Sequence, residues 1–273
     1  MIRDCSLNKT EFARISGISR SMLYYQHRQP SKDWWLKQRI EIVLRQHPSY
    51  GHKRLALHLG ANRKRILRVM HIFGIKPYRR RGRKYRQTKD YSAQYPNLLL
   101  TEYPCYPNHI WASDFTYLKY KKRILYLATI IDLFTKELVG FSVMMFHSVS
   151  LTMNTLLSAV KDHPLPKILH SDQGSEYTSK DYLSLTDNLG IRISMSKKAS
   201  PWENGYQEAF YSQFKVDLGD PNRFSSLGEL VWQISKTIHD YNNTRIHTVL
   251  KMPPALFSQR HQERSSLLLE KVS

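Results

Sequence analysis

Apolar residues in the first quarter of the chain recur every three to four positions, a spacing that predicts helices. Residues 8–25 predict two short helices, in which Gly17 supplies the turn and Ser19 an N-cap for the second helix. Arg20 would open that second helix, where the base-contacting side chains of a helix-turn-helix usually lie. Small helical pairs that bind no nucleic acid share this pattern, so both interpretations stay open.

Two further helical stretches follow, at residues 34–47 and 50–75. The first ends at Pro48, and in the second Gly60 breaks the apolar pattern before Asn62 can cap a new helix. This is a second helix-turn-helix candidate, for which a helical hairpin with solvated cations is the alternative. Its last helix carries cations that lie largely off the apolar stripe and suit phosphates or a major groove: Arg63, Lys64, Arg65 and Arg68.

From about residue 108 the apolar period becomes two, which predicts strands. Three strands with short polar turns predict an antiparallel meander: residues 109–120, 124–132 and 138–146. Helices and strands then alternate: a helix at 150–162, a strand at 167–170, a helix at 179–189, a strand at 191–195 and a helix at 202–218. The order predicts an α/β fold, a mixed five-stranded sheet with helices. Six side chains are expected to face the core: Trp111, Tyr117, Met153, Leu156, Leu157 and Val160.

Residues 225–243 predict one more helix, after which Arg245, His247 and the step Pro253-Pro254 continue as an extended tail. The chain is therefore expected to have five parts. They are a helix-turn-helix-like segment (1–33), a helical DNA-binding segment (34–77), a basic linker (78–107), an α/β core (108–219) and a C-terminal helix with its tail (220–273).

The charge of the chain is concentrated in its first third. Residues 1–90 hold 23 Lys and Arg against 5 Asp and Glu, and residues 91–273 hold 19 against 17, which gives net charges of +18 and +2. Such asymmetry predicts a part that binds a polyanion, most often nucleic acid, and a solvated basic surface without a specific partner is the alternative.

The cysteines number 2, Cys5 and Cys105, which excludes a disulfide scaffold and a cysteine-rich zinc site and fits a reducing cytosol. No apolar run approaches the ~20 residues of a membrane span.

Residues 78–90 form the most basic stretch, with seven Lys and Arg and two tyrosines. No core can be built from this composition, so it predicts a linker that lies along a DNA backbone, and a tether without contacts is the alternative. The expected DNA contacts are Arg79, Arg80, Arg81, Arg83 and Lys84.

Three acids have positions that point to chemistry. Asp114 lies in the middle of a predicted strand, Asp172 follows another strand, and Glu208 lies in a helix. A mid-strand aspartate is costly to bury unless a cation offsets its charge, and oxygen ligands from separate elements suit Mg²⁺ or Mn²⁺. The structural alternatives are a buried aspartate, a turn residue and a surface acid. Asp132, at the end of the second strand, fits a turn or cap residue better than a catalytic one.

Lys215 follows Glu208 by seven positions, so both side chains can face one groove, where Lys215 would contact a phosphate or, alternatively, solvent.

The chain resembles the DDE transposase and retroviral integrase superfamily, whose RNase H-like core has 35 residues between its second Asp and its Glu. Here 35 residues separate Asp172 from Glu208. Four strings resemble, in order, the second-reading-frame transposase of the third insertion-sequence family: WASDFTYL, HSDQGSEY, SPWENGYQEAFYSQFK and YNNTRIHTVLKMPP. With YGHKRLALHLG upstream, the resemblance covers roughly residues 48–257.

The resemblance implies an enzyme that nicks the ends of an insertion element and transfers the exposed 3′-hydroxyl to another phosphodiester. It implies that Asp114, Asp172 and Glu208 are catalytic and hold Mg²⁺ or Mn²⁺, with two ions per site. The implied partners are double-stranded DNA (transposon ends and target), further copies of the chain in a dimer or larger assembly, and an upstream-frame protein or fusion. The implied location is the bacterial cytoplasm at the nucleoid, with no membrane.

Two other functions fit parts of this pattern. A product of the second reading frame alone could be a DNA-binding regulator that needs its upstream partner for catalysis, although the intact acids argue against an inactive core. A plain RNase H-like nuclease would explain the acids but not the basic helical arm.

Overall fold

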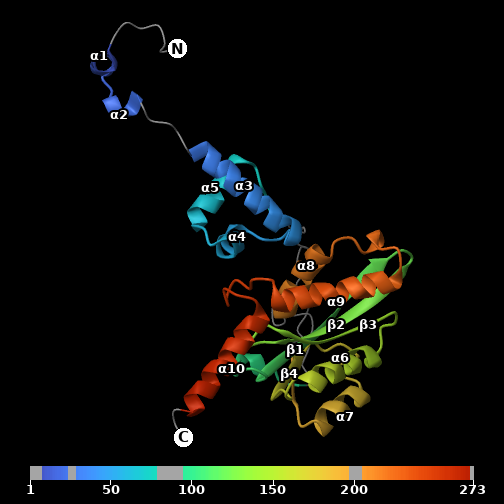
Figure 1. Ribbon diagram of the computed structural model, residues 1–273. Coiled ribbons are helices and arrows are strands. Elements are labelled where there is room, and N and C mark those ends of the chain that lie inside the picture. Colours follow the sequence, from blue (N-terminus) through green and yellow to red (C-terminus); the bar gives the residue numbers. More distant parts are fainter. Residues whose placement is uncertain (1–7, 24–28, 79–94, 197–204, 271–273) are drawn as a thin grey trace.

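The structure is a computed structural model, and it describes residues 8–23, 29–78, 95–196 and 205–270. Its first helices are short, α1 (Lys9–Ile15) and α2 (Arg20–Leu23), and they lie at one end of the molecule, away from the sheet (Figure 1). The side chain of Asn8 caps α1 by accepting a hydrogen bond from the Thr10 N–H, and Gly17 makes the turn with a φ of 63°. The predicted pair of short helices with a turn at Gly17 is confirmed.

Three helices form a separate helical unit with its own core: α3 (Gln29–Gln46), α4 (His52–Leu59) and α5 (Arg63–Ile72). Its buried side chains come from all three helices and the turn after α3: Leu36, Ile40, Val43, Tyr50, Leu55, Ile66, Val69 and Met70. As predicted, α4 ends at Gly60 in the left-handed region, and Asn62 caps α5 by accepting a 2.9 Å hydrogen bond from the Lys64 N–H. The helix α3 crosses the boundary expected between residues 33 and 34.

Five strands form one mixed sheet in the order β3-β2-β1-β4-β5. Their bounds are β1 (Ile110–Tyr120), β2 (Arg123–Asp132), β3 (Leu138–Met144), β4 (Ile168–Ser171) and β5 (Arg192–Met195). The first three strands pair antiparallel, β4 runs parallel to β1, and β5 runs parallel to β4. The predicted meander and the predicted mixed sheet are confirmed, and β1 is the central strand.

Helices cover both faces of this sheet (Figure 1). The helices of one face are α6 (Val149–Asp162) and α7 (Lys180–Asn188), and those of the other are α8 (Gly205–Leu218) and α9 (Leu227–Asn243). Successive residues of a strand point to opposite faces of the sheet, and each face has its own hydrophobic cluster. Ile130 packs in the cluster under α6 and α7, and Ile131 packs in the cluster under α8 and α9. The expectation that Leu157 faces the core is wrong: it is 47% exposed, because only Leu156 of this pair lies on the side of α6 that meets the sheet.

The C-terminal part is more helical than the sequence suggested. The remaining elements are the short turns of helix η1 (Leu98–Leu100) and η3 (Pro221–Arg223) and the helix α10 (Pro254–Glu270). The expected extended tail is therefore wrong beyond Pro253. Pro254 suits the first position of α10, because its fixed φ fits a helix and its missing N–H is not needed there. Of the helices in the described ranges, none combines the length and the apolarity that crossing a membrane requires.

A buried arginine joins the helical unit to the sheet domain. Arg245, only 4% exposed, forms an ion pair with Asp217 of α8 and donates to Gln213 Oε1 at 2.8 Å. Its second Nη donates to the Ser49 hydroxyl at 3.0 Å, and the neighbouring Tyr50 hydroxyl accepts a 2.7 Å hydrogen bond from the backbone N–H of residue 246. One guanidinium thus fixes the turn before α4 against α8. Losing one partner would leave the other buried charge unpaired.

Close packing between β3 and α6 depends on Gly140, because a Cβ there would lie 2.6 Å from the Ala159 Cβ and 2.7 Å from the Thr155 carbonyl oxygen. Gly140→Ala is expected to destabilise the protein by about 1–3 kcal/mol in urea denaturation. The matched control is Gly228→Ala in α9, where a Cβ would meet only the Ser226 Oγ at 3.9 Å. Equal unfolding midpoints for the two variants would contradict this packing.

Candidate active site

The pairing of β1 with β4 brings Asp172 close to Asp114. Ala112 of β1 pairs with His170 of the parallel strand β4, and each aspartate follows its paired residue by two positions, Asp114 within β1 and Asp172 in the loop directly after β4. The carboxylate of Asp172 is near enough to act electrostatically on that of Asp114. Asp114 also accepts a 2.8 Å hydrogen bond from the Phe115 N–H, which fixes one of its oxygens.

The loop after β4 holds Asp172 with its backbone. The Gly174 N–H donates to Asp172 Oδ1 at 2.9 Å, and a Cβ at residue 174 would lie 3.0 Å from that oxygen and from Glu176 Oε2. A larger residue at position 174 would therefore require both carboxylates to shift. Glu176 is buried and lies 3.0 Å from His147 Nε2, so this acid already has a basic partner.

The helix α8 presents the third acid because two buried side chains attach it to the sheet. Gln207 donates through Nε2 to the Ala112 carbonyl at 2.5 Å and to the Thr129 carbonyl at 3.2 Å. Tyr211, one turn later, donates to the backbone carbonyl of Asp114 at 2.6 Å. Glu208 stands in the first turn of the helix with an exposed side chain. The sequence analysis missed Gln207 and Tyr211, although their i, i+4 spacing beside Glu208 is a detectable signal.

Two of the acids, Asp172 and Glu208, act electrostatically on the third, Asp114, whereas the acid that acts on Asp172 is Glu176. Burial first, and then the carboxylates of Asp172 and Glu208, raise the pKa of Asp114 from 3.8 to about 7, against the opposing Phe115 N–H and Lys215. Burial also raises the pKa of Asp172, and the backbone N–H of Gly174 opposes that shift. Because these carboxylates are costly to ionise, a bound cation would stabilise their charged form.

The donor set fits a hard divalent cation, since it consists of carboxylate oxygens from a strand, a loop and a helix. Asp114 and Asp172 would be its nearest ligands, and Glu208 faces them from α8. In the described ranges, however, no group of three His, Cys, Asp or Glu side chains lies close enough together to hold a metal ion. The strands thus bring two acids together, and Glu208 acts on Asp114 through space.

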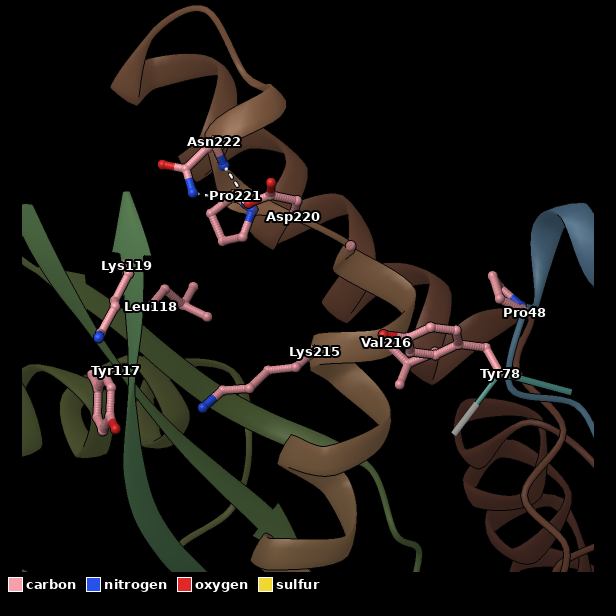
Figure 2. Close-up of a pocket in the computed structure, with 11 residues that line it drawn as sticks. Pro48, Tyr78, Tyr117, Leu118, Lys119, Lys215, Val216, Asp220, Pro221 and Asn222 are labelled. Atoms are coloured by element: carbon pink, nitrogen blue, oxygen red, sulfur yellow. Dashed lines mark hydrogen bonds between the residues drawn. The ribbon is translucent and has the colours of Figure 1, made fainter. Parts of the chain in front are cut away.

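A groove with a volume of about 720 Å³ lies between the carboxyl-terminal turns of α8 and β1, and none of the three acids lines it. Figure 2 shows Lys215 reaching from α8 towards β1, with Tyr117 and Lys119 on that strand and Tyr78 beyond the helix. Lys215 Nζ donates to the Thr116 hydroxyl at 2.5 Å and lies 5.3 Å from the centre of the Tyr117 ring. Tyr117 is 42% exposed, so its expected place in the core is wrong, whereas Trp111 is fully buried as predicted.

The other predicted DNA contacts lie in different surroundings. Arg20, Arg63 and Lys64 are exposed. Arg65 donates to the Lys32 carbonyl, and Arg68 binds both oxygens of Asp33 at 2.5 and 2.8 Å. Arg68 thus fastens α5 to α3, which leaves it less available to DNA than the sequence suggested. The linker cations lie outside the described residues: Arg79, Arg80, Arg81, Arg83 and Lys84.

Asp132 confirms its predicted role as a turn residue. Its Oδ1 accepts hydrogen bonds from the N–H groups of Phe134 and Thr135, and its Oδ2 accepts one from the Asn108 N–H. His170 is buried, and its Nδ1 lies 2.9 Å from the Ser194 hydroxyl of β5. It packs at the strand end, which is one of the two roles left open for it.

Comparison with known proteins identifies the class. Two family models, both for the integrase core domain, match residues 106–201 and 189–254. A chain of the simian T-cell lymphotropic virus intasome, solved in complex with PP2A regulatory subunit B56 gamma, superimposes with a TM-score of 0.51 at 21% identity. The match covers 77% of this chain and 70% of that chain. The fold is therefore the RNase H-like integrase core, and this class comprises polynucleotidyl transferases.

Two relatives narrow the class to one family. The transposase for insertion sequence element IS904 of Lactococcus lactis subsp. lactis (strain IL1403) is 36% identical over 241 residues, which are 82% of this chain and 94% of that protein. The putative transposase InsK for insertion sequence element IS150 of Escherichia coli (strain K12) is 32% identical over 88% of this chain and 89% of that protein. The chain belongs to the insertion-sequence transposases of the DDE and integrase superfamily.

The raised pKa of Asp114 predicts the pH dependence of stability without metal. Between its ordinary value of 3.8 and about 7, the folded chain keeps a proton that the unfolded chain releases. Stability therefore falls as the pH rises through that window and stays low above it. Asp114→Asn removes the charge, so in EDTA at pH 8 we expect a gain of about 1–4 kcal/mol that vanishes near pH 4.

Urea denaturation at both pH values measures this difference, and Asp187→Asn, at an exposed position of α7, is the matched control. A gain for Asp114→Asn that is equal at the two pH values would show that burial and the neighbouring acids do not control this carboxyl group.

Proposed function

We propose that this transposase binds the two ends of its insertion element, nicks each end to expose a 3′-hydroxyl, and transfers that hydroxyl to a second phosphodiester. Asp114, Asp172 and Glu208 would be the catalytic acids and would hold Mg²⁺ or Mn²⁺, with two ions in the site. The observation that supports the proposal is that Asp172, directly after β4, and Glu208 of α8 both act electrostatically on Asp114 of the adjacent strand β1.

Each step of this reaction exchanges one P–O bond for another. In nicking, a water oxygen bonds to phosphorus, the P–O3′ bond breaks, and the released 3′ oxygen takes up a proton. In strand transfer the 3′-hydroxyl loses its proton and bonds to the new phosphorus, whose own 3′ oxygen leaves. When bound, divalent ions would favour loss of the proton and offset charge on the leaving oxygen.

The chain's own residues supply position and charge around that reaction. Gln207 and Tyr211 hold α8 so that Glu208 stays opposite β1, and the Gly174 loop holds Asp172. Lys215, in the groove between α8 and β1, would neutralise a phosphate of the bound strand. Its cationic end lies between α8 and β1 (Figure 2), and its charge acts on Asp114.

Double-stranded DNA is the proposed substrate and partner. The first third of the chain carries most of the net charge and would hold the element ends through exposed cations such as Arg63 and Lys64. Because an element has two ends that must meet, we infer a dimer or larger assembly of this chain on DNA. An upstream-frame protein or fusion would join it, and the nucleoid of a bacterial cell would be its location.

One observation favours a second function, that of a DNA-binding regulator. In the part of the chain that the structure describes, the acids are not gathered into a three-ligand site, and Glu208 is exposed. A chain that assembles its metal site only with an upstream-frame partner would bind element ends without cutting them.

Metal-dependent strand transfer separates the two functions. A labelled duplex ending in the terminal repeat is incubated with the protein in Mg²⁺, Mn²⁺ or EDTA. We expect joined products with either metal and none in EDTA. Glu208→Gln is expected to lower the rate by about 10²-fold or more, since loss of an outer-sphere partner of a metal ligand alone costs about 10–100-fold.

The control for this assay is Asp187→Asn, which changes a carboxylate of α7 remote from the acids and should keep the full rate. A duplex that shifts in a gel and is never cut or joined with any metal would refute the enzymatic proposal and favour the regulator.

The groove beside α8 predicts a salt effect. If Lys119 and Lys215 each contact one backbone phosphate, Lys119→Gln and Lys215→Gln should each lower the slope of log K against log[salt] by about 0.9, equally for any DNA sequence. Filter binding at several salt concentrations measures the slope. Lys161→Gln, on the exposed side of α6, should leave it unchanged, and the groove carries no DNA if all three variants match the parent.

A further inference from the structure

A second, smaller cavity lies on the side of α8 that faces away from the acids. Its volume is about 150 Å³, room for a few water molecules or for one phosphate group. Four basic side chains from three separate segments line it: Arg54 of α4, Lys136 of the turn after β2, and Arg245 and His247 of the segment after α9. Nothing in the reaction at Asp114 uses this cavity.

Two of these cations have no anionic partner. Arg245 is paired with Asp217, but across the described residues no carboxylate lies within ion-pair distance of Arg54 or Lys136. Lys136 donates only to the Leu133 carbonyl, and its Nζ lies 4.2 Å from the centre of the Tyr206 ring. Burial lowers the pKa of both Arg54 and Lys136, so their charges are costly where they stand.

Asp132, the acid that acts on Lys136, already accepts hydrogen bonds from the backbone. Asp132 attracts Lys136, but both of its oxygens accept backbone N–H groups in the turn after β2. An additional anion is therefore the group that would offset the remaining charge.

Two buried nitrogen atoms at this cavity also lack a hydrogen-bond partner among the described residues. Arg54 Nε and His247 Nδ1 are excluded from solvent and have no partner in the described structure. The amino end of the 14-residue helix α8 lines the same space through Gly205 and Tyr206. The dipole of this helix adds positive potential there.

We propose that this cavity is a phosphate site, in which Arg54, Lys136 and the first turn of α8 surround one tetrahedral phosphate group. A guanidinium fork, an ammonium and helix N–H groups approaching from different elements match the several oxygens of a phosphate better than the two of a carboxylate. The phosphate could belong to a DNA backbone or be free inorganic phosphate. The site is independent of the proposed reaction, because it lies across α8 from Glu208 and Lys215.

Thermal unfolding of the full chain in EDTA tests the site, with sodium phosphate compared with sodium chloride at equal ionic strength. We expect phosphate to raise the midpoint by about 2–4 °C in a saturable way. Lys136→Gln should abolish this rise, while Lys136→Arg should keep most of it. Lys161→Gln, on the exposed side of α6, is the control and should behave as the parent does.

The midpoint of Lys136→Gln in chloride alone shows whether that variant still folds. It should equal or exceed that of the parent, since the substitution removes a partly buried cation that has no carboxylate partner among the described residues. A lower midpoint would mean that Lys136 supports the fold instead, and Arg54→Gln would then be measured in its place. A phosphate response that is absent in the parent, or unchanged in both Gln variants, overturns the proposal.

Filter binding to a DNA duplex distinguishes the two sources of phosphate. A salt slope lowered by about 0.9 in Lys136→Gln identifies a backbone phosphate of DNA. An unchanged slope together with a lost midpoint shift identifies free phosphate. The outcome does not depend on strand transfer, so failure of this site and failure of the proposed reaction give different results.

Discussion

The carboxylate of Asp114, partly buried on the central strand and close to other acids, is the constraint on which the functional part of the structure depends. Burial and like charge together raise its pKa to about 7, so the metal-free fold carries a cost at neutral pH. Carboxyl groups with such strongly raised pKa values are found mainly at functional sites. Burial accounts for the largest part of this cost, and the parallel pairing of β1 with β4 adds to it, because the pairing brings Asp172 close to Asp114.

The helix α8 contacts both the strand that carries Asp114 and, through Arg245, the helical unit. One side of the helix is attached to β1 and β2 through Gln207 and Tyr211 and presents Glu208 and Lys215. Its later turns hold Arg245, which also binds the turn before α4. A shift of the helical unit would therefore act on the same helix that carries the third acid. This is a physical route by which DNA bound at the helical unit could influence the catalytic site.

Most of the fold and the three acids could be predicted from the sequence, because strand alternation, Gly60 and Asn62 are local signals that the structure confirms. The sheet order was not predicted, because it depends on contacts between strands that lie far apart in the sequence, and the grouping of the three acids in one site came from the resemblance. The predicted burial of Leu157 and Tyr117 was wrong. Their spacing in the apolar pattern allowed burial, but both side chains are exposed. The roles of Arg245 and Arg68 were not predictable, since their partners Asp217 and Asp33 lie 28 and 35 positions away.

The central claim is that the acids of β1, β4 and α8 form one divalent metal site. Crystals grown with Mn²⁺ and a terminal-repeat duplex, measured at the manganese absorption edge, test it most directly. The account predicts an anomalous peak in contact with the carboxylates of Asp114 and Asp172, with Glu208 turned towards it. Manganese bound to other side chains, with no peak between these aspartates, would contradict it.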